Sequence, residues 1–416
     1  MSAENKNVAT ALKDHVVYPH YVQVKNQLRA KGFVCWIAGG AVRDLILGRI
    51  PADFDLVTDA TTEKILEIFP EALTIGVQFG VVKLVLENQL FFDLATFRRE
   101  SDYIDGRRPS HVDFATPEED ALRRDFTINA LFWDDEKQQV VDFVGGLNDL
   151  QHGLIKCVGQ SAVRFKEDHL RILRLLRFSI QFGFKVEAQT LQAATEQVKS
   201  LEKISGERIW NELIKMVDFI CWSQFFKNSF VRIIFESLFP IQLPHSFSDQ
   251  LENQFVRCDQ ITPSGVQNGL YKFFYFLLML SRSYDVLVKN LRTRMKVSKS
   301  DLQILENFHF CLLNQPQLSD IEWLYEIEKN PQLLAVFEFL SYLQLPFNFI
   351  EIQKKYISRP PKVVDGNDLR GLVEHPQMGA VLKKIRLLQF VQPDLDKALI
   401  LERLFQNKII STKHKV

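Results

Sequence analysis

The sequence predicts the α+β fold class, with strands and helices mixed in the N-terminal part and helices alone in the remainder. Two short runs, VVKLVL at 81–86 and LFFDLATF at 90–97, have the β-branched and aromatic content of strands. The break between them at 87–89 favours a hairpin. From about residue 225 onward the apolar runs are longer and helical in pattern, and the 34 phenylalanines of the chain indicate a large helical core.

The length and composition exclude several classes of protein. At 416 residues the chain is long enough for several domains, because one core rarely grows beyond about 250–300 residues. The 51 basic residues balance the 51 acidic ones, so any affinity for nucleic acid must come from a local basic patch. No run of about 18 apolar residues occurs, and the N-terminal residues are polar. These features indicate neither membrane insertion nor secretion, and we expect a cytoplasmic protein.

The cysteines point to no disulfide framework and no zinc site, because they are scattered, odd in number and without CxxC spacing. We expect all five to be reduced and buried: Cys35, Cys157, Cys221, Cys258 and Cys311.

The ordinary elements of the N-terminal part follow from local patterns. Residues 1–35 have an amphipathic pattern that predicts a helix against the first strand. The run TTEKILEIF at 61–69 predicts a helix capped by Thr61. The run VVDFVGGLNDL at 140–150 predicts a strand followed by a glycine turn.

The most informative stretch is WIAGGAVRDLILGRIPADFD at 36–55, which predicts a strand, a glycine turn, a short amphipathic segment and a second strand. Asp53 and Asp55 lie one residue apart on that second strand, so they share one face. Taken alone, such a pair is often a solvated strand end. Two adjacent carboxylates raise each other's pKa, however, and a divalent cation removes this conflict, so we predict a Mg²⁺ site.

The glycine turn of the same stretch suits a phosphate group. Gly39 and Gly40 let another backbone or a ligand approach closely, and Arg43 follows as a planar cation. Together with the two carboxylates, this arrangement predicts a site for a nucleoside triphosphate.

Three later segments carry polar residues whose role is open from the residues alone. Asp93 lies on the face of Phe91 and Ala95 in an apolar strand, as a paired structural acid or a catalytic one. The polar segment 98–124 predicts a long loop, either disordered or functional. The run RRDFTINAL at 123–131 predicts either a capped helix start or an arginine pair that binds phosphates.

Residues 163–184 have a strong helical pattern with one charged and one apolar face. On a helical wheel the charged side chains fall within about 60° of Arg171, and the apolar ones lie roughly opposite. A solvated, salt-bridged face is the alternative to a binding face. The charged set is Arg164, Glu167, Asp168 and Arg174. The run SGERIWNE at 205–212 predicts a further helix with features of a capping box at Ser205.

These motifs together resemble those of class II CCA-adding enzymes (tRNA nucleotidyltransferases) and bacterial poly(A) polymerases. The matching segments are GGAVRDLILG and DFD in 39–55, Asp93 followed by Thr-Phe-Arg, RRDFTINA from Arg123, and EDHLR from Glu167. The resemblance implies a nucleotidyltransferase head in which Asp53 and Asp55 bind Mg²⁺ and Asp93 is a third catalytic acid.

The resemblance also implies a nucleotide site. Arg123 and Arg124 would contact phosphates, with Asp125 and Asn129 near the ribose. The EDxxR motif, which includes Glu167, would read the incoming base: Asp168 accepts from the amine that cytosine and adenine share, and Arg171 donates to their ring acceptors. The helix continues with Arg174 and Arg177, which would lie toward the triphosphate. The motif ERxxxE at 207–212 resembles a structural element of the neck.

The domains that the resemblance implies are a head at 1–150 with a small mixed sheet, and an all-helical neck at 151–224, body at 225–345 and tail at 346–416. A basic helix in the tail supplies candidate contacts to the tRNA backbone, unless it is only a solvated face. The candidates are Lys383, Lys384 and Arg386, with Lys413 and Lys415.

The expected function is template-independent addition of CCA to tRNA by a monomeric enzyme that uses CTP, ATP and Mg²⁺. A poly(A) polymerase usually has a basic stretch where this chain has GVQFG at 76–80. An enzyme that adds only CC would lack most of the segment 98–124. The sequence leaves two alternatives open: an enzyme that adds only A, and an inactive RNA-binding relative.

Overall fold

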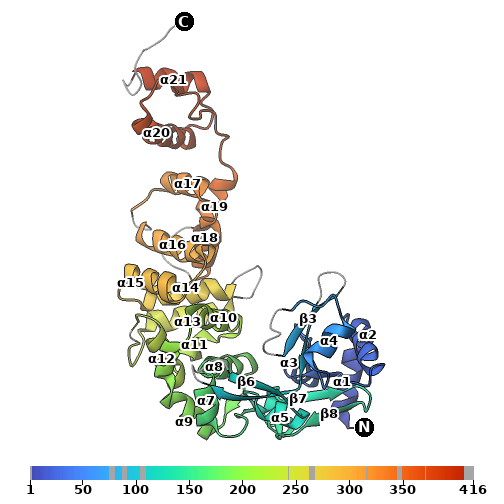
Figure 1. Cartoon of the computed structure of the whole chain (residues 1–416). Coiled ribbons are helices and arrows are strands. Elements are labelled where there is room, and N and C mark those ends of the chain that lie inside the picture. The colour runs from blue at the N-terminus through green and yellow to red at the C-terminus, as the bar shows by residue number, and fades with distance from the viewer. Residues whose placement is uncertain are drawn as a thin grey trace. The chain divides into compact units, whose positions relative to one another are not determined.

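The computed structural model describes residues 2–74, 80–86, 91–103, 109–241, 243–261, 268–314, 317–343, 349–370 and 372–406. They form two compact units. The first consists of Met1–Ile220 with Ser229–Leu238, and the second consists of Cys221–Asn228 with Phe239–Val416. Strands and helices mix in the first unit, whereas the second is almost entirely helical (Figure 1), which confirms the α+β class. The division at residues 150, 224 and 345 stays a prediction.

A mixed six-stranded sheet organises the described part of the first unit. Only β2 and β4 run parallel; the other neighbours pair antiparallel, including the predicted β3–β4 hairpin. Buried side chains on one side of the sheet, among them Ala38, Val57 and Phe132, form a core cluster. In sheet order the strands are β3 (Val81–Val85), β4 (Phe91–Thr96), β2 (Asp55–Thr58), β1 (Trp36–Ala38), β7 (Leu131–Asp134) and β8 (Gln139–Asp142).

The parallel pairing of β2 with β4 needs a crossover, and α4 (Thr62–Ile68) supplies part of it. The side chain of Thr61 accepts a hydrogen bond from the Lys64 backbone N–H, which confirms the predicted cap. The register of this pairing places Asp55 on β2 directly beside Asp93 on β4.

The N-terminal region contains two helices where we expected one over residues 1–35. They are α1 (Ala3–Lys13) and α2 (Tyr18–Arg29), and α2 begins with Pro19 in its first turn. Proline is favoured at a helix start and disfavoured inside a helix, which accounts for the division. Tyr21, Val24 and Leu28 are the buried residues of α2, and α3 (Gly40–Ile46) follows β1.

The segment 98–124 is not a loop, and that prediction was wrong. It contains the antiparallel strands β5 (Arg98–Tyr103) and β6 (Pro109–Phe114), followed by α5 (Pro117–Leu122), which Thr116 and Glu119 cap reciprocally. A polar strand pair without an apolar face shows no alternation of apolar residues, so the sequence pattern missed it. The glycine-containing tip at 104–108 lies outside the described residues.

The predicted helix 163–184 is interrupted at Asp168. It consists of α7 (Ser161–Glu167) and α8 (Arg171–Phe182), with Asp168 in an extended conformation between them. The Asp168 carboxylate accepts a hydrogen bond from the Leu170 backbone N–H, a local contact that competes with the helix. Asp168 at the break and the arginines of α8 line the cavity described below.

The first unit contains several further short helices and strands. Ser205 takes the position before α10, but its side chain caps no backbone N–H, contrary to our expectation. The glycine turn predicted after residue 142 is present, with Gly145 before α6. These elements are η3 (Thr127–Asn129), α6 (Gly146–Gln151), β9 (Leu154–Ile155), β10 (Lys185–Val186), α9 (Ala188–Glu196), η4 (Val198–Lys203), α10 (Gly206–Ile214), η5 (Val217–Phe219) and α12 (Ser229–Leu238).

The second unit has an aromatic core, as the phenylalanine content predicts. Trp222, Phe255 and Phe276 pack with ring centroids 4.5–4.7 Å apart along two contacts. Its helices are α11 (Trp222–Phe225), α13 (Asp249–Gln260), α14 (Asn268–Leu280), α15 (Tyr284–Lys289), η6 (Asn290–Arg294), α16 (Lys299–Asn314), α17 (Asp320–Lys329), α18 (Leu333–Tyr342), α19 (Phe349–Ile357), η7 (His375–Gln377), α20 (Met378–Val391) and α21 (Lys397–Gln406).

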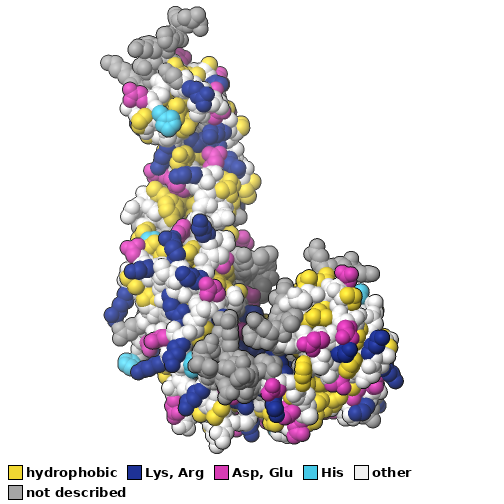
Figure 2. All heavy atoms as spheres, in the orientation of Figure 1, with side chains coloured by type: hydrophobic (Ala, Val, Ile, Leu, Met, Phe, Trp, Pro, Cys, Tyr) yellow, Lys and Arg dark blue, Asp and Glu magenta, His cyan; other side chains and the backbone are white. Residues whose placement is uncertain are grey.

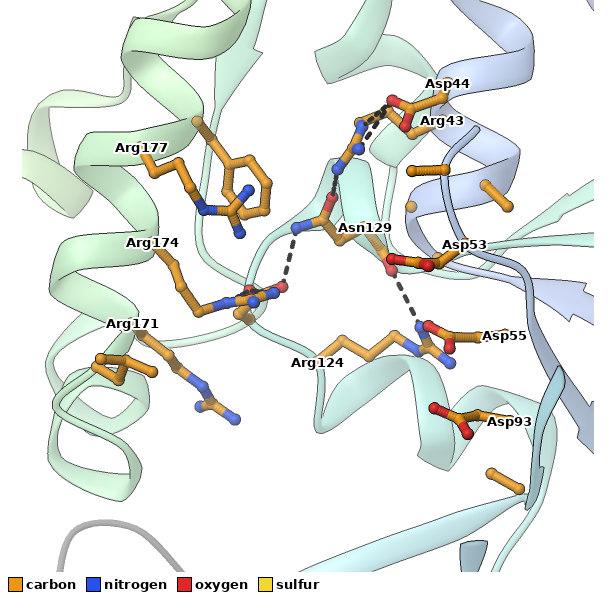
Figure 3. A pocket seen from close by; sticks show the side chains of 18 of the residues that line it. Arg43, Asp44, Asp53, Asp55, Asp93, Arg124, Asn129, Arg171, Arg174 and Arg177 are labelled. Atoms are coloured by element: carbon orange, nitrogen blue, oxygen red, sulfur yellow. Dashed lines mark hydrogen bonds and ion pairs between the residues drawn. The ribbon is translucent and has the colours of Figure 1, made fainter. Parts of the chain in front are cut away.

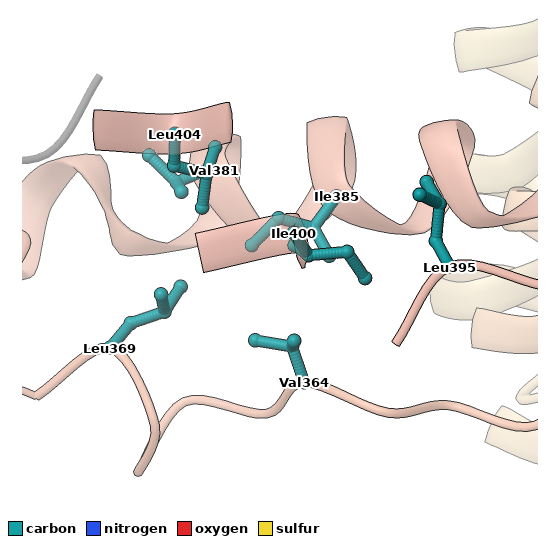
Figure 4. Close-up of a cluster of buried hydrophobic side chains, with 7 residues drawn as sticks. All are labelled: Val364, Leu369, Val381, Ile385, Leu395, Ile400 and Leu404. Carbon is teal, nitrogen blue, oxygen red and sulfur yellow. The ribbon is translucent and has the colours of Figure 1, made fainter. Parts of the chain in front are cut away.

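The last two helices enclose a small core of their own. Figure 4 shows aliphatic side chains from α20, α21 and the segment before them pointing toward one another. The buried members of this cluster are Val364, Leu369, Val381, Ile385, Leu395, Ile400 and Leu404.

Three general predictions can be compared with the structure. Basic and acidic side chains are interspersed on the face shown in Figure 2, in keeping with their equal numbers. All five cysteines are unpaired, and four are buried, but Cys221 is exposed, contrary to our expectation. Within the described ranges, no helix has the length and apolar character needed to cross a bilayer.

Candidate active site

A cavity of about 790 Å³ in the first unit gathers almost every residue that the sequence analysis selected there. This volume falls within the range of about 300–1,000 Å³ that is typical of small-molecule sites. Glu167 is the one predicted residue of this set that does not line it. The predicted residues in its wall are Gly39, Gly40, Arg43, Asp53, Asp55, Asp93, Arg123, Arg124, Asp125, Asn129, Asp168, Arg171, Arg174 and Arg177.

The three predicted acids lie together on one wall. Asp55 is the first residue of β2 and pairs in register with Asp93 on β4, while Asp53 precedes the strand by two residues. Phe54 and Leu56 are buried between and after them, so the alternation of faces that we predicted holds. Figure 3 shows the carboxylates of Asp53, Asp55 and Asp93 in a row on the same side of the cavity.

The electrostatics of this row favour a cation. Partial burial raises the pKa of Asp55; Arg124 opposes this shift, whereas the like charges of Asp93 and Asp53 add to it. Lys83 approaches Asp93 to 3.5 Å between Nζ and Oδ1, at the solvent-facing side. An additional positive charge among the acids would therefore be stabilised.

The carboxylates of this row can supply some, but not all, of the ligands of a Mg²⁺ ion. Carboxylate oxygens are the hard ligands that this ion prefers, and it is commonly held by one or two carboxylates and substrate phosphates. Within the described ranges, no three His, Cys, Asp or Glu side chains form a ready-made metal cluster. Asp53 and Asp55 would thus supply part of the ligand set.

Gly39 shows why the turn before α3 requires glycine. Its φ is 70°, and a Cβ atom at this position would lie 2.8 Å from Nη1 of Arg124. The close approach lets Arg124 reach the backbone carbonyl of Asn129 at 3.2 Å. On the following helix Arg43 is buried, with Nε 2.8 Å from Oδ1 of Asp44 and Nη1 donating to the side chain of Asn129.

The arginine pair is held by a carboxylate that the sequence analysis missed. Asp120 on α5 has no exposed surface; its two oxygens accept from Nη2 of Arg123 at 2.7 Å and Nη2 of Arg124 at 3.0 Å. Burial favours the neutral acid, but Arg124 and Arg123 outweigh it and lower the pKa of Asp120. The spacing of three and four residues on a helix was a usable signal for these pairs.

A buried hydrogen-bond network connects α3 to α8 across the cavity floor (Figure 3). Asn129 lies between Arg43 and Asp125, and it donates to Oδ1 of Asp125 at 3.1 Å. Arg174 on α8 donates to Oδ2 of Asp125 through Nε at 2.7 Å and forms an ion pair through Nη2 at 2.6 Å. Burial opposes the charge on Asp125, but Arg174 and Arg171 lower its pKa to about 2. Asp125 is therefore an ionised bridge in this structure.

The residues expected to read the base lie where α7 gives way to α8. Arg171 donates through Nη1 to Oε2 of Glu167 at 2.7 Å and through Nη2 to the carbonyl of Arg123 at 3.1 Å. Oδ2 of Asp168 accepts from Nη2 of Arg208 at 2.8 Å. A carboxylate offers about four acceptor positions, so Asp168 has capacity for a further donor.

The ERxxxE motif contributes to the cavity wall, which the sequence analysis did not anticipate. Arg208 lines the cavity and pairs with Asp168. Glu212, one turn later on α10, is buried and accepts from Nε of Arg177 at 2.7 Å. The two ends of this motif thus hold two polar residues of the α7–α8 segment. Their opposite charges and the four-residue spacing were the available signal.

In the second unit, one candidate RNA contact is buried in an ion pair. Arg386 is 3% exposed, and its Nε and Nη2 each lie 2.6 Å from an oxygen of Glu328, so its charge is already neutralised. Lys383 lies 3.8 Å from Glu326, whereas Lys384 is exposed and forms no ion pair with the described residues. Lys413 and Lys415 lie outside the described residues.

Comparison with known proteins agrees with this geometry. Residues 35–156 match the family described as Poly A polymerase head domain, and residues 183–244 match Probable RNA and SrmB- binding site of polymerase A. The curated CCA-adding enzyme of Streptococcus mutans is 44% identical over 200 residues, 48% of this chain and 49% of the relative. That of Bacillus pumilus is 36% identical over 239 residues, 57% of this chain and 58% of the relative. The matches span about half the length of these relatives.

Solved structures show that the fold extends over the whole chain. The CCA-adding enzyme of Bacillus stearothermophilus in complex with CTP has a TM-score of 0.73 at 23% identity, covering 95% of this chain and 99% of that one. The Thermotoga maritima enzyme complexed with tRNA-CCA has a TM-score of 0.65 at 20% identity, covering 97% and 98%. Residues 35–156 are thus similar to the Poly A polymerase head domain, and the fold of this chain is similar to that of solved CCA-adding enzymes.

Proposed function

We propose that this protein is a template-independent tRNA nucleotidyltransferase that adds CCA to tRNA 3′ ends from CTP and ATP and releases pyrophosphate. One observation carries the proposal: three aligned acids face arginines and a base-reading pair across one cavity of nucleotide size. The name CCA-adding enzyme, printed for the curated relatives, supports the choice of product.

The acids would act at the reacting phosphate. Asp53 and Asp55 would hold Mg²⁺, which supplies positive charge at the α-phosphate and at the attacking oxygen when bound. Asp93, beside them in register, would accept the proton of the RNA 3′-hydroxyl. The hydroxyl oxygen then attacks the α-phosphorus. The bond from the α-phosphorus to the oxygen that bridges it to the β-phosphorus breaks, and pyrophosphate leaves.

The arginines would bind the triphosphate and restrain its position. Arg43, Arg124 and Arg174 each have a carboxylate partner that fixes the guanidinium, and all three line the cavity. Fixed donors lose little freedom when a phosphate binds, which favours reaction by positioning. Gly39 and Gly40 let the guanidinium groups of Arg124 and Arg43 lie close to the backbone at this wall.

Base selection would rest on Asp168 and Arg171, with Glu167 holding the latter. The pair is matched to groups that cytosine and adenine share, and uracil presents a carbonyl where cytosine presents an amine. Arg208 would keep Asp168 oriented between additions. The protein thereby takes the place of a template strand.

The RNA partner, location and oligomeric state follow from this proposal. Lys383 and Lys384 stay candidates for tRNA-backbone contacts, and Arg386 does not. We expect a monomer in the cytoplasm, where an enzyme acting on tRNA with CTP and ATP would find all three.

The deciding experiment incubates the protein with tRNA transcripts that end before, within and after CCA, supplied with CTP and ATP separately and together. The proposal expects C addition to transcripts that lack C residues, then one A, and no extension of complete ends. Addition of A alone to CC ends, or a long A tail, would replace it by an A-adding enzyme or a poly(A) polymerase. Binding of tRNA without incorporation would indicate an inactive relative.

A further inference from the structure

Three arginines of the cavity share the ring of one phenylalanine. The guanidinium carbons of Arg43, Arg174 and Arg177 lie 5.3, 5.3 and 4.1 Å from the ring centroid of Phe178. Each distance is within the range in which a cation is attracted to an aromatic ring. Phe178 is on α8 with two of the arginines, and the third comes from α3, so the ring connects the two walls of the cavity.

Each of these arginines is also held by a carboxylate at its N–H edge. Asp44, Asp125 and Glu212 bind Arg43, Arg174 and Arg177 respectively. Each guanidinium thus has a carboxylate along its edge and the Phe178 ring beside its plane, and Arg43 also lies 4.6 Å from the ring centroid of Phe182. Among the described residues, Nη1 of Arg174 and Nη2 of Arg177 form no hydrogen bond.

The ring itself has little freedom to move. Phe178 is 3% exposed, although it lines the cavity. Phe126 contacts it edge to face at 5.8 Å with an interplanar angle of 87°, and Phe182 stacks on it at 5.8 Å and 12°. A ring packed in this way keeps its electron-rich face in one place.

Three guanidinium groups this close together repel each other, so they need groups that attract them. Burial lowers the pKa of Arg43, Asp44 opposes this change, and the positive charge of Arg177 adds to it. Without a ligand, like charges in a partly desolvated cavity repel each other and would separate. An aromatic face attracts cations yet forms no hydrogen bond with their N–H groups, so it leaves those groups available.

We propose that Phe178 is a positioning residue for the triphosphate of the incoming nucleotide: its ring holds Arg43, Arg174 and Arg177 together before the phosphates arrive. The proposal rests on the proposed function for the identity of the ligand. It assigns Phe178 no contact with the reacting atoms. A phosphate chain would meet donors that are already assembled, which saves the cost of ordering them.

The first test measures binding without RNA. Titration calorimetry with CTP and with inorganic tripolyphosphate should show Phe178→Leu weakened by roughly five- to thirtyfold toward both, as expected for losing about two or three cation–π contacts. Phe178→Tyr, which keeps the ring, should bind within about threefold of wild type. Phe165→Leu, in a buried site on α7 with no described guanidinium over its ring, is the matched control and should leave binding unchanged.

A second series separates electrostatics from packing, in case Phe178→Leu folds poorly. Replacing Phe178 by phenylalanine with one, two or three ring fluorines weakens the negative ring face with little change in shape. Tripolyphosphate affinity should fall stepwise along the series while the melting temperature stays level. Equal affinity across the series, tighter binding by Phe178→Leu, or no binding of tripolyphosphate by wild type would overturn the proposal.

The same measurements distinguish failure of the proposed function. A wild-type protein that incorporates no nucleotide yet shows the graded loss of tripolyphosphate binding would keep the role of Phe178 and remove the tRNA reaction. Normal incorporation with a flat fluorine series would do the opposite.

Discussion

Two basic helices of this protein, α8 in the first unit and α20 in the second, look alike in sequence and differ in what their arginines can bind. Arg174 and Arg386 are both held by a carboxylate through Nε and Nη2. Arg386 also donates through Nη1 to the carbonyl of Pro361 and the side chain of Gln389, and through Nη2 to the carbonyl of Pro360. Arg174 keeps Nη1 without a described protein acceptor and lines a cavity.

The difference shows that a buried Arg–carboxylate pair is either a structural contact or a ligand site, depending on the donors left over. In α20 every guanidinium nitrogen is satisfied inside the protein, so the pair stabilises the junction of α17, α20 and the chain before it. In α8 the carboxylate fixes the guanidinium while one nitrogen faces the cavity.

The largest effect is expected at the acids that face the α8 arginines. Asp53→Ala and Asp55→Ala should each reduce nucleotide incorporation by about a thousandfold or more, because they remove stabilisation of the transition state. Asp93→Asn should also be severely impaired. Gel assays of incorporation report the rate, while tRNA binding and melting curves should match wild type. Wild-type turnover in either alanine variant would refute the metal assignment.

A smaller effect is expected in base selection, at the start of α8. Asp168→Ala should relax the exclusion of UTP relative to CTP by roughly ten- to a hundredfold, because it removes a hydrogen bond to a charged acceptor. Arg171→Ala should weaken use of both CTP and ATP. Asp168 also pairs with Arg208, so Arg208→Ala reports how much of the effect comes from losing the orientation of Asp168. If the ratio of CTP to UTP use stays fixed while the melting temperature falls, the pair is only structural.

The matched arginine variants test the contrast directly. Arg174→Met should weaken CTP binding by about tenfold, the loss of one charge-assisted hydrogen bond. Arg386→Met should leave CTP binding and the rate per folded molecule unchanged, and should lower stability by about 1–3 kcal/mol, because Glu328 is partly exposed and keeps Arg359 as a partner. Denaturant unfolding and calorimetry measure the two properties separately. The contrast between α8 and α20 fails if both variants show the same profile.

The smallest effect concerns acid stability of the cavity floor. The pKa of Asp125 is about 2 in the folded protein, below its ordinary value of 3.8, so its ionised form stabilises the fold above pH 3.8 and this contribution disappears as the pH falls toward 2. The contribution amounts to about 2 kcal/mol. Between pH 5 and pH 2, the free energy of unfolding measured with urea should therefore fall more in wild type than in Asp125→Asn. Parallel curves would mean that Asp125 is not the ionised bridge described above.

Much of the candidate site could be predicted from the sequence, because its residues lie in short segments with strong local patterns. The spacing of two residues places Asp53 and Asp55 on one side of an extended segment, although β2 itself begins only at Asp55. The glycine turn before Arg43 and the run from Arg123 to Asn129 likewise depend on local geometry. The structure brings these segments together around one cavity.

Only the tertiary structure decided which partners these side chains have. Asp168 meets Arg208 across 40 residues and Arg177 meets Glu212 across 35, and no periodic pattern specifies such pairs. The sequences of β5 and β6 are mostly polar, so no apolar alternation reveals their pairing, and a strong helical pattern conceals the break at Asp168. Arg386 illustrates the physical reason. A sequence shows that a side chain is charged, but long-range packing determines whether water, a ligand or a buried carboxylate neutralises it.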